Sequence, residues 1–258
     1  MKKLAVLLAV PLLLGCSKKN PTTVVQSKAI FAEINTNSAE VHIVSEPTME
    51  ASGVTARVIY ENVQVTLLEK EAKPGMIYLR DYFPNPLYGF RCSLEVSTPL
   101  GSSRGVVRVP WITSLYRPRD GDTLPWADIL VAWSYARGDW YELDYGYSAG
   151  DSNRNWLGSA DTQTVTTDTS AVIRLSFLQK YPGATYLYLY CWVYPHQGPK
   201  PGEAGNMSGD IRGYLLGSGW GDGAGFCMGS PPPGLGSVLP PRMDEEKRRV
   251  ALRRLYGL

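Results

Sequence analysis

Short segments in which apolar and polar residues alternate follow one another along most of this chain. In Tyr88–Ser97, for example, every second residue from Phe90 to Val96 is apolar, which predicts a strand with one buried and one solvated face. The 258 residues include 26 glycines, 19 prolines, 16 tyrosines and 7 tryptophans, a composition that favours strands and turns over long helices. No long amphipathic helical pattern interrupts the series, so we predict an all-β fold.

The strand patterns fall into two series, and we predict two tandem antiparallel β-sandwiches with a short C-terminal helix. The first sandwich is expected at 29–112 and the second at 113–230. Gly213–Gly219 is expected to belong to the second sandwich, which also carries a long insert at 148–169. Residues 231–258 are expected to form a proline-rich linker and the terminal helix.

The strand pattern in each half carries a resemblance to a known domain family. In the second half, Leu130–Trp133, Tyr141–Tyr145 and Tyr186–Tyr190 resemble strands of fibronectin type III domains. In the first half, Tyr88–Pro110 is similar to bacterial immunoglobulin-like repeats. The resemblance implies a sandwich fold and a role in binding, spacing or display, and it implies no catalytic residue.

The N-terminus predicts export. Lys2 and Lys3 precede an apolar run of 11 residues, Leu4–Leu14, as in a secretory signal peptide, and a membrane-spanning helix would need ~20 residues. The end of this run, Leu13–Cys16, resembles the lipobox of bacterial lipoproteins. That resemblance implies removal of residues 1–15 and attachment of diacylglycerol and palmitate to Cys16, with 16–28 as a tether.

Localisation and partners follow from this N-terminus and from the charge. Ser17 after the lipidated cysteine is compatible with delivery to the outer membrane in the lipoprotein class. Without Lys2 and Lys3, 24 basic residues balance 24 acidic ones, which argues against nucleic-acid binding. We expect a cell-envelope protein held to the membrane through Cys16, with a protein or glycan partner.

The remaining cysteines leave two alternatives open. Cys191 and Cys227 could form a disulfide across neighbouring strands, which is permitted outside the cytoplasm. Alternatively, Cys92, Cys191 and Cys227 are all small buried side chains. Only two histidines are present, and neither lies near a pair of cysteines, so no metal site and no cofactor are expected.

Candidate catalytic groups have simpler explanations. Gly205–Gly209 has the wrong spacing for a serine-hydrolase elbow, and His42 or His196 would have to be the base. Glu142 and Asp144 could pair as glycosidase carboxylates, but they alternate with apolar residues and read as the solvated side of a strand. We therefore expect a protein that is not an enzyme, with an envelope hydrolase as the least favoured hypothesis.

One strand pattern suggests a ligand-binding surface. Five aromatic residues recur at every second position and should share one face of a strand: Tyr186, Tyr188, Tyr190, Trp192 and Tyr194. If exposed, this aromatic face would suit stacking on sugar rings. Alternatively, the 148–169 insert or the other domain covers the rings, or they form cross-strand packing pairs.

The tail from Met243 to Leu258 is the one good helical pattern. It carries several lysines and arginines, and basic amphipathic helices can lie on anionic lipid. Its apolar set, expected to include Leu255 and Leu258, is small, so we expect a solvated or frayed terminal helix instead.

Taken together, the sequence predicts a membrane-anchored binding or scaffolding module of the cell envelope. A carbohydrate-binding protein that uses the aromatic face is the main alternative.

Overall fold

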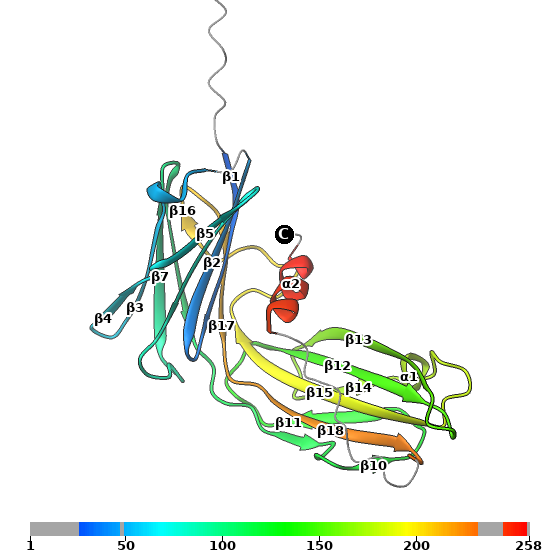
Figure 1. The fold of residues 1–258 in the computed structure, drawn as a ribbon. Coiled ribbons are helices and arrows are strands. Elements are labelled where there is room, and N and C mark those ends of the chain that lie inside the picture. The colour runs from blue at the N-terminus through cyan, green and yellow to red at the C-terminus, as the bar shows by residue number, and fades with distance from the viewer. Residues whose placement is uncertain (1–25, 47–48, 232–244, 257–258) are drawn as a thin grey trace, which may run out of the picture.

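The computed structural model describes residues 26–46, 49–231 and 245–256. Cys16, the signal peptide and most of the predicted tether lie outside these ranges. The described part is almost entirely β-structure, arranged as two sandwiches with one helix in the angle between them (Figure 1). The predicted all-β fold with two sandwiches is confirmed.

The first sandwich packs two layers around a shared apolar core, and all their strand pairs are antiparallel except β1–β17. One layer has the order β17-β1-β2-β6-β5, and the other has the order β16-β8-β7-β3-β4. Its elements are β1 (Gln26–Asn35), β2 (Ser38–Glu46), η1 (Ala51–Gly53), β3 (Thr55–Tyr60), β4 (Val63–Thr66), β5 (Glu69–Lys73), β6 (Met76–Tyr82), β7 (Arg91–Thr98), β8 (Gly101–Arg108), β16 (Ser208–Gly209) and β17 (Gly213–Ser218).

The second sandwich packs β13-β12-β15-β18-β10 against the three-stranded sheet β14-β11-β9. Its elements are β9 (Leu115–Arg117), β10 (Thr123–Leu124), β11 (Ile129–Trp133), β12 (Trp140–Gly150), β13 (Trp156–Thr166), β14 (Ser170–Ile173), α1 (Leu175–Leu178), β15 (Tyr186–Gln197) and β18 (Asp222–Gly229). The 148–169 segment is no separate insert, because it forms the turn and second arm of the long β12–β13 hairpin.

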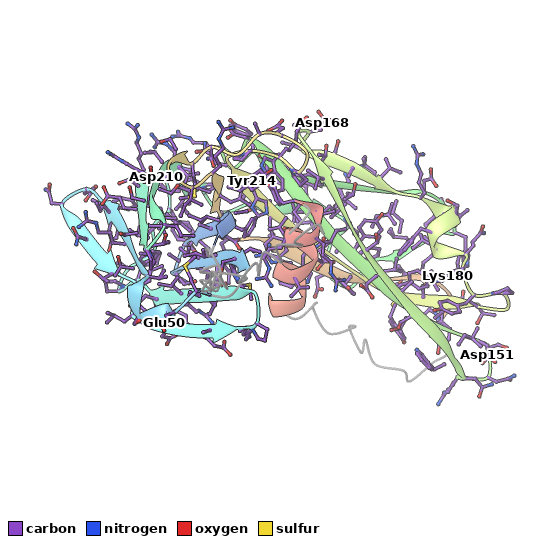
Figure 2. All side chains as sticks on the ribbon, turned by 90° about the horizontal axis from the view of Figure 1, so that it is seen from above. Glu50, Asp151, Asp168, Lys180, Asp210 and Tyr214 are labelled. Atoms are coloured by element: carbon purple, nitrogen blue, oxygen red, sulfur yellow. The ribbon has the colours of Figure 1, made fainter. Side chains whose placement is uncertain are left out.

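The chain returns from the second sandwich to complete the first. Strand β17 pairs in parallel with β1, from Ile30↔Gly213 to Asn35↔Ser218, and β16 pairs with β8. Figure 2 accordingly shows Asp210 in the same lobe as Glu50, far from Asp151. The assignment of Gly213–Gly219 to the second sandwich was therefore wrong. The physical reason is that its apolar residues fill the first core, where Leu215 is fully buried.

Strand β17 also joins the sandwiches into one sheet. After pairing with β1, it pairs with the end of β15 at His196↔Ser218 and Gln197↔Gly217. One ten-stranded sheet thereby runs through both sandwiches. A side chain at Gly217 would place its Cβ 2.1 Å from the carbonyl oxygen of Arg108, so this crossing requires a glycine.

The C-terminal helix α2 (Glu245–Leu255) lies in the angle between the sandwiches (Figure 1). Leu252 and Tyr256 pack with Phe31, Trp140 and Leu216, which come from both sandwiches. Leu255 is 44% exposed, and Leu258 lies outside the described residues. The expectation of a solvated or frayed helix was wrong, because a different face of the helix, that of Leu252, is buried. Neither helix of the described chain is long and apolar enough to cross a membrane.

The position of β17 gives a testable prediction. Leu215→Ala should destabilise the protein by about 2–5 kcal/mol, because it leaves a cavity in the first core. Hydrogen exchange should show the loss of protection in β1 of the first sandwich, although residue 215 follows β15 of the second. The half-exposed Leu130 of β11 is the matched control, and equal loss in Leu130→Ala would contradict the prediction.

Candidate functional site

A cluster of buried polar side chains lies where the two sandwiches and α2 meet. We call it the junction cluster, and all its members are at most 3% exposed: Glu33, Glu142, His196, Ser218 and Arg248. They come from five different elements, β1, β12, β15, β17 and α2. Burying charged groups is costly unless they are paired and hydrogen-bonded, so the bonds within the cluster decide what it does.

Arg248 connects the two sandwiches. Its Nη1 donates to Oε2 of Glu142 at 2.9 Å, and its Nη2 donates to Oε1 of Glu33 at 3.3 Å. Its guanidinium also lies 4.5 Å from the centre of the Tyr194 ring, a cation–π contact. Glu33 belongs to the first sandwich and Glu142 to the second. The helix therefore holds both sandwiches through one buried cation.

The other half of the cluster is a Ser–His–Glu chain. His196 Nδ1 lies 2.8 Å from Ser218 Oγ, and His196 Nε2 lies 3.1 Å from Glu142 Oε2. The imidazole stacks on Trp140, with 4.2 Å between ring centres, and Gln163 donates to Glu142 Oε1 at 2.8 Å. With the proton on Nε2, every polar atom of the imidazole has a partner.

The order of these groups is that of a hydrolase triad, with a hydroxyl, an imidazole and a carboxylate in sequence. A nucleophile must also reach its substrate, but Ser218 is only 3% exposed and His196 is fully buried. Oε2 of Glu142 additionally accepts the bond from Arg248. The arrangement therefore joins β12, β15 and β17 and does not present a nucleophile to solvent.

A second polar contact fixes the other end of α2. The Arg253 guanidinium donates to His42 Nδ1 on β2, which requires that nitrogen to be unprotonated. Burial lowers the pKa of His42, and the charge of Arg253 lowers it further, whereas the hydrogen bond to Glu40 opposes the change. A cavity of about 240 Å³ beside this contact is lined by both of these side chains and by Glu40.

The predicted aromatic face is buried. Tyr186, Tyr188, Tyr190 and Tyr194 are each at most 8% exposed, and Trp192 is half-buried. Their rings lie against glycines of the neighbouring strands, so that a Cβ at Gly150 would be 2.2 Å from the Tyr186 hydroxyl and one at Gly223 would be 2.4 Å from the Trp192 ring. The condition for a stacking platform, exposure of these rings, is therefore not met for the four tyrosines, and the alternative of packing within the sheet holds.

The predicted disulfide does not form. Cys191 and Cys227 are both free. In the β15–β18 ladder Cys191 lies opposite Ala224, whereas Cys227 lies opposite Tyr188. This odd offset places the two thiols on opposite faces of the sheet. Burial raises the pKa of the Cys191 thiol to about 12, so it stays protonated and unreactive.

The described residues contain no group of three or more histidine, cysteine, aspartate or glutamate side chains that could hold a metal ion. In the loop at 151–155, Asp151 Oδ1 accepts bonds from the backbone N–H groups of Asn153 and Asn155, at 2.8 and 2.9 Å. These bonds form a turn closed by the aspartate side chain. Cys16, the predicted lipidation residue, lies outside the described residues.

Sequence reasoning did not find the junction cluster. Glu142 was interpreted as the solvated side of a strand, and His196 as a surface or packed histidine. One signal was available in the tail, where Arg248, Leu252 and Tyr256 recur every four residues and must share one helix face. The partners of that face belong to other elements, so the sequence pattern alone could not name them.

Known proteins show at most a weak similarity to this chain. No family model matches the chain, and no curated protein matches it. The chain is similar to the solved FN1–FN3 domains of chicken CNTN1, with 10% identity, a TM-score of 0.28, and coverage of 79% of this chain and 67% of that one.

The chain is also similar to a solved cytokine receptor complex, with 14% identity and a TM-score of 0.25 over 67% of this chain and 91% of that one. A third similar structure is a chimeric titin Z1Z2 tandem, with 6% identity and a TM-score of 0.22 over 78% of this chain and 96% of that one. Structural similarities with TM-scores this low say nothing about the function of this chain.

The role of Arg248 can be tested by Arg248→Met. This change leaves two carboxylates buried without their cation, which should lower the free energy of unfolding by about 3–5 kcal/mol. Arg254→Met is the matched control on the same helix, because Arg254 is exposed, and it should change stability by at most about 0.5 kcal/mol. Urea unfolding followed by tryptophan fluorescence measures the stability of both variants. Equal losses of stability would contradict the role of Arg248 in joining the sandwiches.

His42 should make stability depend on pH. Its folded pKa lies below the ordinary histidine value of 6.5, so the unfolded chain takes up a proton at a pH where the folded chain does not. Stability from this residue is full above pH 6.5 and is lost as the pH falls towards the folded pKa. His42→Gln should therefore lose less stability than the natural chain between pH 7.5 and 5.5. Urea unfolding measures these losses, and equal losses of stability in His42→Gln and the natural chain would contradict the prediction.

Proposed function

We propose that this chain is a lipid-anchored protein of the bacterial cell envelope that binds or positions a partner and is not an enzyme. The observation that carries the proposal is the double connection between the sandwiches. A continuous sheet joins them through β15 and β17, and Arg248 joins them through Glu33 and Glu142. Two connections of this kind suit a protein that holds surfaces in a fixed geometry above a membrane.

The tether and the fold fit such an anchor. Nine residues separate Cys16 from Gln26, where β1 begins, and nine extended residues span at most roughly 30 Å. Strand β1 lies between β2 and β17 in the middle of the large sheet. A pull on the tether would therefore act on a strand bonded on both sides, and delivery to the outer membrane remains part of this proposal.

The other two hypotheses lose their main support. A carbohydrate-binding role for the aromatic face needs exposed rings, and those rings are largely buried. An envelope hydrolase needs an accessible nucleophile, and the hydroxyl in the Ser–His–Glu chain is buried. Binding or scaffolding through some other surface is the function that the geometry favours.

The anchor is tested by Cys16→Ser in the full chain expressed in a bacterial host. The variant should move from the membrane to the soluble envelope fraction, because it lacks the thiol that would carry the lipid, and its circular dichroism should be unchanged. Cys227→Ser is the matched control, because this free thiol is far from the tether, and it should remain at the membrane. Membrane association that persists without Cys16 would refute the proposed anchor.

A further inference from the structure

The outward face of the five-stranded sheet of the first sandwich carries an excess of positive charge. This sheet lies on the side of the sandwich away from α2 (Figure 1). Four arginines point outward from its strands, and we call this surface the arginine face: Arg57, Arg91, Arg104 and Arg108. A single carboxylate, Glu95, lies among them in the described structure. The predicted mature chain has no net charge, so the excess is local to this face.

The pairing of these charges is unusual. Glu95 is bound by Arg57, whose Nε lies 2.6 Å from Oε2. Arg104 lies opposite Glu95 in the β7–β8 ladder, yet within the described chain it forms no ion pair. Arg91 lies directly opposite Arg108 in the same ladder. Like charges in that position destabilise a sheet, and a bound anion would remove the penalty.

Beside this pair of arginines, two aromatic rings frame a hollow of about 510 Å³. Tyr88 and Trp111 are stacked, with 6.5 Å between ring centres and 11° between planes. Trp111 lies against Gly89, where a Cβ would be 2.9 Å from the indole and φ is +76°. Arg108 Nη1 donates to the carbonyl oxygen of Gly89 at 2.8 Å. The indole is nonetheless 47% exposed, so a flat ring is presented next to two guanidinium groups.

The other end of the face holds a second hollow, of about 750 Å³. Arg57, Arg104 and Glu95 line it together with hydroxyl groups from five strands: Thr55, Thr66, Ser97, Ser102 and Ser208. The carboxylate of Glu61 lines the first hollow together with Arg91, and that of Asp210 accepts a bond from the backbone N–H of Ser102 at the other end. The eight residues of β8 between them span roughly 26 Å, which is long enough for several sugar rings in a row.

We propose that the arginine face binds an acidic oligosaccharide, a chain of sugars that carry carboxylates. Arginines suit carboxylates, serine and threonine hydroxyls suit sugar hydroxyls, and an aromatic ring suits the apolar face of a pyranose. A protein partner would be expected to meet a surface with a more apolar centre. At the outward positions of these strands, the only large apolar side chains are Ile59 and Val106. The proposal names a partner for the binding role and rests on that role, but it does not depend on the anchor.

The test measures the binding of tetragalacturonate to the full chain by calorimetry, with cellotetraose as the neutral probe. The acidic probe should bind, more weakly at high salt, and the neutral probe should bind much less. Arg91→Gln with Arg104→Gln should weaken binding roughly tenfold or more, and Trp111→Ala should weaken it as well. Arg117→Gln with Arg119→Gln, two exposed arginines of the second sandwich, is the matched control and should bind as the natural chain does.

Several outcomes would overturn the proposal while leaving the anchor untouched, because the fractionation of Cys16→Ser is read separately. Failure of the folded natural chain to bind tetragalacturonate is one. Equal weakening in the control variant, or equal binding of cellotetraose, is another. Binding of tetraglutamate as tight as that of tetragalacturonate would assign the face to an acidic peptide. Arginine-dependent binding to phosphatidylglycerol vesicles without tetragalacturonate binding would assign it to lipid headgroups.

Discussion

One buried cation ties α2 to both sandwiches and reinforces the sheet that joins them. Arg248 is almost fully buried, and it bonds carboxylates from both sandwiches. Burial makes each of these bonds stronger than a surface ion pair and makes the loss of any partner costly. The apolar contacts of Leu252 and Tyr256 exclude water from the same region. The last helix of the chain thus contributes to the geometry of strands that precede it by more than 200 residues.

The Ser–His–Glu chain shows how burial changes the meaning of a set of residues. The donors and acceptors follow the order of a catalytic triad, and the distances of 2.8 and 3.1 Å are ordinary hydrogen bonds. At the surface of a cleft, these groups would point to acyl transfer. Here they satisfy one another where β12, β15 and β17 meet, and the same bonds that could activate a nucleophile instead hold strands together.

Much of the fold could be predicted from local sequence. Alternation of apolar and polar residues located β7, because strand periodicity is a local property. The aromatic face of β15 was correctly predicted to lie on one side of the strand, but the sequence did not show whether that side is exposed. Glycines of β12 and β18 make room for the rings, and those glycines become neighbours only when the strands pair. The register of β15 against β18, which separates Cys191 from Cys227, likewise exists only once those strands pair.

The sequence by itself determined the all-β character of the chain and the period-two pattern of strands such as β7 and β15, and it predicts a signal peptide and a lipobox-like cysteine at the N-terminus. Only the tertiary structure decided that β17 returns to pair with β1, that α2 is buried, and that the partners of Arg248 are Glu33 and Glu142. It also decided that the arginines of β7 and β8 gather on one face. These features depend on contacts between residues far apart in the chain, and no local pattern specifies which distant partner a strand or a charge will meet.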